Sequence, residues 1–179
     1  MIDIKEILTK SEMLGLVIPD REYDKMLIKV ASILSEGYDK VLYISIDKPY
    51  KSLVSDLKQI SDGKINMDKF HFIDCITRTE RDAQSTKNCT YISSPLALDE
   101  IHRTILNILK KRRIDVTLVD SPSSLSTYYE HMDVLKFMHL LMTKLIIAKC
   151  KGVFPFHRES AGPARRSIEM FVDKIVYLE

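Results

Sequence analysis

Short apolar runs that alternate with helix-periodic segments limit most strongly how this chain can fold. The runs are rich in branched residues, and the segments between them carry apolar residues three or four positions apart. Strands joined by helices of ten or more residues pair in parallel, because each crossover returns the chain to the same end of the sheet. The pattern predicts an α/β fold with a mostly parallel central sheet. We expect strands at 14–19, 40–46, 70–76, 90–94, 115–120, 152–156 and 171–178.

Capping signals place the helices between these runs. One helical pattern ends at Gly37, and glycine is a natural helix C-cap. Pro49 suits the first turn of the next helix, and Ser94 with Pro95 suits the N-cap and first turn of a third. A long helix is expected over about 130–149.

Composition bounds the class of protein. The net charge of +2 gives no electrostatic case for nucleic acid as the main partner. Three scattered cysteines without a C-x-x-C pair predict reduced thiols in a cytoplasmic protein and no metal site. The charged N-terminus and the short longest apolar stretch, 145–148, predict neither a signal peptide nor a membrane span. The 179 residues fit one domain, with residues 1–13 as a helical extension.

Three segments carry a resemblance to a known family. VLYISIDKPYKSL (41–53) is similar to that family's second strand and the proline and helix after it. VTLVDSPSSL (116–125) resembles a Walker B strand, and FVDKIVYLE (171–179) resembles a late strand. In this order they resemble the RecA-like domain of the KaiC ATPases over about 14–179. The resemblance implies a three-layer α-β-α RecA-like P-loop NTPase fold, assembly through RecA-like faces, and ATP with Mg²⁺ as ligands of a working member.

The segment that would hold phosphate departs from the family's pattern. P-loops wrap phosphate with glycine-rich backbone, a lysine and a magnesium-binding hydroxyl. By position Lys25 stands for the lysine, but Met26 replaces the hydroxyl residue. No glycine occurs between Gly15 and Gly37, so the loop lacks a residue that adopts positive φ freely. Three carboxylates also stand near the start of the following helix: Asp20, Glu22 and Asp24. They complement the helix dipole and repel an incoming triphosphate.

The acidic residues expected to perform catalysis are also altered. The resemblance implies two adjacent acids after the second strand, where this chain has Asp47 and Lys48. A general base must reach the attacking water, so Asp47 is a vestige of that pair or a cap for the next helix. Asp120 matches the Walker B aspartate that would hold Mg²⁺ through water. Its alternative role is a polar strand end that hydrogen-bonds to the serine-rich turn 121–124.

Two arginines offer a further contact site. Arg165 and Arg166 lie in a segment between the last two predicted strands. RecA-like proteins that bind DNA use loops in comparable places, so these residues are candidates for contact with nucleic acid or with a partner.

We therefore expect a catalytically inactive relative of the KaiC ATPases. It would act in the cytoplasm as a regulatory, signalling or assembly protein, through a protein partner or as a homo-oligomer, without a cofactor. Two alternatives stay open. One is an ATP-binding switch or weak ATPase that still uses Lys25 and Asp120 with Mg²⁺. The other is a recombination-type accessory protein that binds single-stranded DNA through Arg165 and Arg166.

Overall fold

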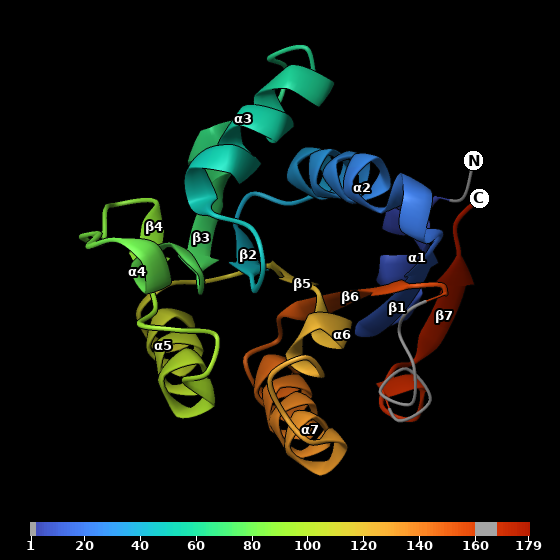
Figure 1. The fold of residues 1–179 in the computed structure, drawn as a ribbon. Helices are drawn as coiled ribbons and strands as arrows, with labels where there is room; N and C mark the ends of the chain where they lie inside the picture. The colour runs from blue at the N-terminus through green and yellow to red at the C-terminus, as the bar shows by residue number, and fades with distance from the viewer. Residues whose placement is uncertain (1–2, 160–167) are drawn as a thin grey trace.

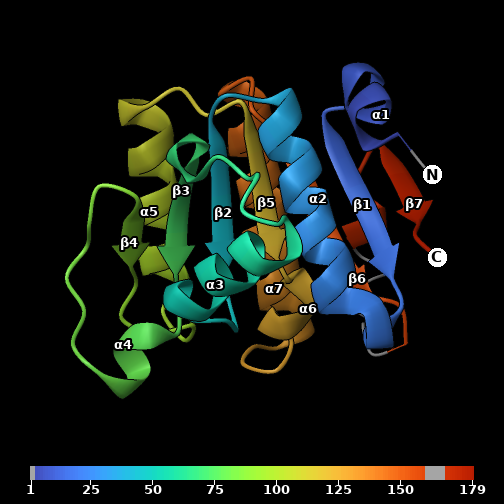
Figure 2. The same cartoon turned by 90° about the horizontal axis from the view of Figure 1, so that it is seen from above.

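A seven-stranded parallel sheet forms the middle of the structure, a computed structural model that describes residues 3–159 and 168–179. The strand order is β4-β3-β2-β5-β6-β1-β7, and every neighbouring pair is parallel. The arrowheads visible in Figure 2, such as those of β1, β2 and β3, point toward the edge where the short helices α4 and α6 lie. The strands are β1 (Met13–Ile18), β2 (Val41–Ser45), β3 (Phe70–Asp74), β4 (Cys89–Tyr91), β5 (Val116–Asp120), β6 (Lys151–His157) and β7 (Lys174–Tyr177).

Helices cover both faces of the sheet. Figure 1 shows α1, α2 and α3 on one side and α5 and α7 on the other. Within the part of the chain that the structure describes, no helix has the length and apolarity needed to cross a membrane. The helices are α1 (Ile4–Lys10), α2 (Tyr23–Gly37), α3 (Tyr50–Ile60), α4 (Thr77–Glu80), α5 (Leu98–Lys111), α6 (Pro122–Leu125) and α7 (His131–Ile147), with 3₁₀ turns at Asp20–Glu22 and Met67–Lys69.

Alternate residues of the inner strands enter two separate cores. In β2, Val41 and Tyr43 pack with α2 and α3, whereas Leu42 and Ile44 pack with α5 and α7. All five residues of β2 are buried, as they are in β3 and β5. Strands covered on both faces read as continuous apolar runs, which is why the sequence pattern located them.

The structure confirms the α/β class and each of the seven predicted strands, and the sheet is wholly rather than mostly parallel. Two predicted helix starts are wrong. Helix α5 begins at Leu98, because Ser94 closes a separate turn: its hydroxyl accepts the N–H of Leu96 and its carbonyl accepts the N–H of Ala97. Pro49 is the N-cap of α3 and not its first helical residue.

The parallel arrangement brings the carboxyl ends of the strands to one edge. Register pairs Ser45 of β2 with Asp120 of β5, and Ile18 of β1 with His157 of β6. The chain leaves β2 toward α3 and β5 toward α7, which lie on opposite faces (Figure 1). Such a switch point is where parallel α/β sheets place their binding sites.

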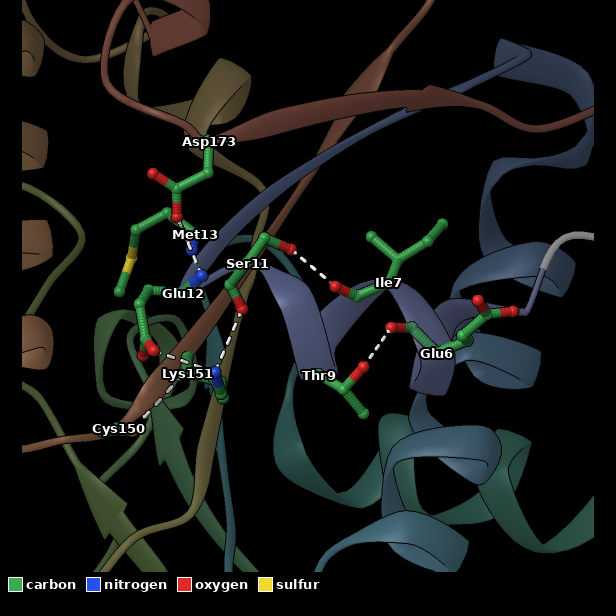
Figure 3. A network of polar contacts seen from close by, with 9 residues as sticks. All are labelled: Glu6, Ile7, Thr9, Ser11, Glu12, Met13, Cys150, Lys151 and Asp173. Carbon is green, nitrogen blue, oxygen red and sulfur yellow. Dashed lines mark hydrogen bonds and ion pairs between the residues drawn. The ribbon is translucent and has the colours of Figure 1, made fainter.

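Polar contacts at the opposite edge fasten the start of β1 to its neighbours (Figure 3). The Asp173 carboxylate, just before β7, accepts the N–H groups of Glu12 and Met13 at 2.8 and 2.9 Å. The Lys151 ammonium, in β6, donates to the carbonyl of Ser11 at 3.1 Å and pairs with the Glu12 carboxylate at 2.9 Å. These contacts hold the segment between α1 and β1 against both adjacent strands.

We expect Asp173→Ala to lower the free energy of unfolding by about 1–2 kcal/mol, because two N–H groups lose a charged acceptor in a partly solvated place. Urea denaturation followed by circular dichroism measures the change. Asp82→Ala, at an exposed aspartate in the loop after α4, serves as the control and should change stability by less than about 0.5 kcal/mol. Equal effects of the two substitutions would contradict this role of Asp173.

Candidate functional site

Two tyrosine hydroxyls donate hydrogen bonds to the carboxylate of Asp120. Asp120 ends β5 and is only 8% exposed. The hydroxyl of Tyr43, from β2, donates to Oδ2 at 3.0 Å. The hydroxyl of Tyr23, from the first turn of α2, donates to Oδ1 at 3.1 Å. Each oxygen of the carboxylate thus has a donor from within the chain, and the three residues join β5, β2 and α2.

Burial sets the protonation of this group. It raises the pKa of Asp120 to about 7, and the two tyrosine hydroxyls offset only part of that rise. Burial, followed by the nearby Asp120 charge, also raises the pKa of Tyr23 and of Tyr43 well above the usual value. Both tyrosines therefore stay protonated hydrogen-bond donors. The carboxyl of Asp120 is partly protonated at neutral pH.

The ring of Tyr23 also stacks on the imidazole of His157. The ring centroids are 3.7 Å apart and the planes differ by 13°. His157 ends β6, and its Nδ1 lies 3.5 Å from Oδ1 of Asp20. Tyr23 is 5% exposed, so its side chain lies buried between the ends of β5 and β6.

The loop between β1 and α2 is a 3₁₀ turn whose backbone N–H groups bond within the chain. The N–H of Asp20 donates to the Glu159 carboxylate at 2.8 Å, and the N–H of Glu22 donates to the carbonyl of Pro19 at 3.0 Å. The N–H of Tyr23 donates to the carbonyl of Asp20. No residue from 19 to 25 has a positive φ. A phosphate cradle needs free N–H groups on a backbone that curls around the anion, and this turn lacks that form.

Lys25 is directed to solvent. Its side chain is 62% exposed, and its ammonium lies 3.7 Å from the Glu22 carboxylate. The neighbouring Asp24 pairs with Lys48 at 3.6 Å, and Lys48 also bonds Asp56 at 2.6 Å. Among the contacts of the described residues, none joins Lys25 to Asp120. The two residues that the resemblance matches to a nucleotide site therefore lie in different surroundings, Lys25 in solvent and Asp120 buried.

Asp47 lies at the rim of the same edge. Desolvation raises the pKa of its carboxyl, and the Ser124 hydroxyl and His157 partly offset that rise. The prediction that Asp47 caps α3 is wrong, because Asp74 does so: its Oδ2 accepts the N–H of Tyr50 at 2.7 Å.

Asp74 has a structural role at this edge that the sequence did not reveal. It is fully buried at the end of β3 and also accepts the N–H groups of Ile76 and Thr77 and the Thr77 hydroxyl. The pattern showed an aspartate at a strand end, but no local signal indicates which later helix it caps.

Hydroxyls of the serine-rich turn after β5 bond one another, and that of Ser124 also interacts with Asp47. The Ser121 hydroxyl lies 2.6 Å from that of Ser123 and 3.4 Å from that of Ser124. The turn continues into α6, with Pro122 as its first residue. The Asp120 carboxylate accepts the hydroxyls of Tyr23 and Tyr43, and not a bond from this turn as its alternative role predicts.

The remaining candidate residues are the two arginines of the segment before β7. Arg165 and Arg166 lie outside the described residues. Within residues 3–159 and 168–179, no three His, Cys, Asp or Glu side chains are grouped so that they would hold a metal ion. No protein-family model matches this chain, and comparison with curated proteins finds no match.

Protonation of Asp120 predicts a pH-dependent stability. The folded protein holds this proton up to about pH 7, whereas an unfolded aspartate releases it near pH 4. The free energy of unfolding should therefore fall as the pH rises through that window, by at most about 4 kcal/mol at about 1.4 kcal/mol per pKa unit.

Asp120→Asn removes the titrating group while keeping the side chain's shape, so its advantage over the wild type should grow between about pH 4 and pH 7. Urea unfolding at several pH values measures that difference, and Asp82→Asn should show no such trend. A constant difference between Asp120→Asn and the wild type would contradict the raised pKa of Asp120.

Proposed function

We propose that this protein is a catalytically inactive homologue of the KaiC/RecA-like ATPases that acts in regulation, signalling or assembly through protein–protein contacts. The observation that carries the proposal is the pair of tyrosine hydroxyls on Asp120. They donate to both carboxylate oxygens of the residue that the family resemblance matches to a magnesium-linked aspartate.

The arrangement of strands supports kinship with RecA-like domains. β6 lies between β1 and β5, and all three strands are parallel. The loop after β1 and the end of β5 consequently face the same edge of the sheet, where a nucleotide would bind in a working member.

The chemistry at that edge supports the loss of hydrolysis. A carboxyl that holds Mg²⁺ through water must be ionised and open to solvent, whereas Asp120 is buried with its pKa raised to about 7. Met26 has no oxygen to bind the metal, and the side chain of Lys25 pairs with Glu22. The loop carboxylates accept protein N–H groups or pair with protein cations, as Asp24 does with Lys48. Several independent features therefore oppose the binding and hydrolysis of Mg·ATP.

Two hollows of the surface lie away from the Asp120 edge and are open to a ligand or partner. One of about 640 Å³ lies between α2 and the end of β7, lined by Met26, Val30 and Leu178. Another of about 530 Å³ lies at the opposite edge of the sheet from Asp120, beside Lys40 and Arg112. Neither is lined by Asp120, Tyr23 or Asp47.

Calorimetric titration with ATP tests this proposal. We expect no Mg²⁺-dependent binding by the wild type and no hydrolysis above that of buffer, because the loop has no free cradle. Lys25→Ala and Lys29→Ala form a matched pair on α2, since Lys29 lies one turn further along and lines the 640 Å³ hollow. Mg²⁺-dependent binding that Lys25→Ala abolishes and Lys29→Ala preserves would overturn the proposal in favour of an ATP-binding switch.

A further inference from the structure

Helix α7 carries more apolar surface than its packing against the sheet requires. Its inner face is buried in the core through Val134, Phe137, Met138, Leu141, Met142 and Leu145. Four further large apolar side chains on this helix are exposed to solvent: Met132 (58%), Leu140 (46%), Ile146 (52%) and Ile147 (68%). Figure 1 shows α7 in the outer layer of the fold, below β5 and β6. Several large apolar side chains exposed along one helix are unusual for a surface that only water covers, and they point to a protein interaction site.

The spacing of these residues makes the face nearly symmetric along the helix. Met132 lies eight positions before Leu140, and Ile147 lies seven positions after it. Residues seven or eight apart share one face of a helix. If a second α7 runs antiparallel and crosses at Leu140, Met132 of each copy faces Ile147 of the other. The two copies of Leu140 then meet at the centre, so one surface is complementary to itself.

The charges at the two ends of α7 select the antiparallel direction. Glu130 and Asp133 are exposed at its start, while Lys144 lies in its last turn and Lys149 is exposed just after it. Antiparallel packing places each acidic end beside the basic end of the other copy, and parallel packing places like charges together. These charges also complement the helix dipole, but the dipole leaves the exposed isoleucines unexplained. Lys136 lies between Asp133 and Leu140, and its ammonium is 3.9 Å from the Asp133 carboxylate; both side chains stay more than half exposed, so Asp133 can also face a cation of the second copy.

The neighbouring segment adds to the same face. Phe171 packs on His139 of α7, with ring centroids 5.1 Å apart. Met170, the preceding residue, is 81% exposed. A second copy that covers the middle of α7 would therefore meet a further apolar side chain at its border.

We propose that two copies of this chain form a homodimer in which their α7 helices pack antiparallel about a two-fold axis near Leu140. A two-fold contact uses the same patch on both chains and closes on itself, so it yields a dimer and not a filament. The patch lies on the outer face of α7 and includes neither Asp120 nor Lys25. The dimer is therefore independent of nucleotide, and it names a partner for the assembly role proposed above.

Cysteine cross-linking tests the position of the axis. The three native cysteines are fully buried, so they contribute little background. Under mild oxidation Leu140→Cys should form a disulfide-linked dimer, because the two copies of position 140 meet at the axis. Leu96→Cys is the matched control, since Leu96 is 63% exposed but lies in the turn before α5. A dimer band for Leu140→Cys alone supports the proposal, and equal cross-linking of the two variants, or none in either, overturns it.

Solution mass measured by light scattering across a wide range of protein concentration tests the surface chemistry. The wild type should approach twice the mass of one chain. Leu140→Glu should remain a monomer, and Leu96→Glu should dimerise like the wild type. Asp133→Lys and Lys144→Asp should each weaken dimerisation, and the double variant should restore it by exchanging the charges.

A wild type that stays monomeric, or a dimer that survives Leu140→Glu, would overturn the proposal. Circular dichroism of each variant confirms that its fold is retained. If Leu140→Glu is misfolded, the charge exchange decides by itself, because rescue by the double variant requires contact between the two ends of α7. None of these measurements involves ATP, so failure of the dimer leaves the proposal about Asp120 standing.

Discussion

A parallel sheet that is buried on both faces must satisfy its polar side chains at the strand ends, and this constraint organises the molecule. Register aligns Asp74, Ser45 and Asp120 across β3, β2 and β5 in one row at the carboxyl edge. All three are buried, so each needs partners from within the chain. Ser45 donates to the carbonyl of Lys48, Asp74 accepts four donors from Tyr50, Ile76 and Thr77, and Asp120 accepts two tyrosine hydroxyls. The loops that follow β2 and β3 are arranged around these bonds.

The two buried aspartates at this edge have different partners, and neither carboxylate is open to solvent. Asp74 binds three backbone N–H groups and a hydroxyl, and so helps to start α3 and α4. Asp120 has only two neutral hydroxyls, which leave its pKa raised to about 7. Tyr23 supplies one of them from the helix that would present a phosphate loop in a working ATPase, and its ring is stacked on His157. Tyr23 thus both donates to Asp120 and covers it with a buried ring.

Helix α7 shows a different balance between core and surface. One face is fully used by the core beneath the sheet, and the other keeps four large apolar side chains in water. The sequence shows α7 only as a broadly apolar helix. Periodicity does not distinguish an apolar residue that the core buries from one that stays exposed on the surface. The structure makes that separation. The near-symmetric spacing about Leu140 and the opposite charges at the helix ends then indicate another copy as the partner.

Local patterns by themselves determined the α/β class, the seven strands and the loss of loop features at 19–26, because apolar periodicity, glycine content and the missing hydroxyl are properties of neighbouring residues. They failed at Ser94, where a turn replaced the expected cap, and at Asp47, where Asp74 of another strand accepts the N–H of Tyr50. Only the tertiary structure decided which side chains meet at the carboxyl edge. Tyr23 and Tyr43 reach Asp120 across sequence separations of 97 and 77 residues. No local pattern encodes such contacts, since they depend on strand order and register, which bring the ends of β2, β5 and α2 together in space.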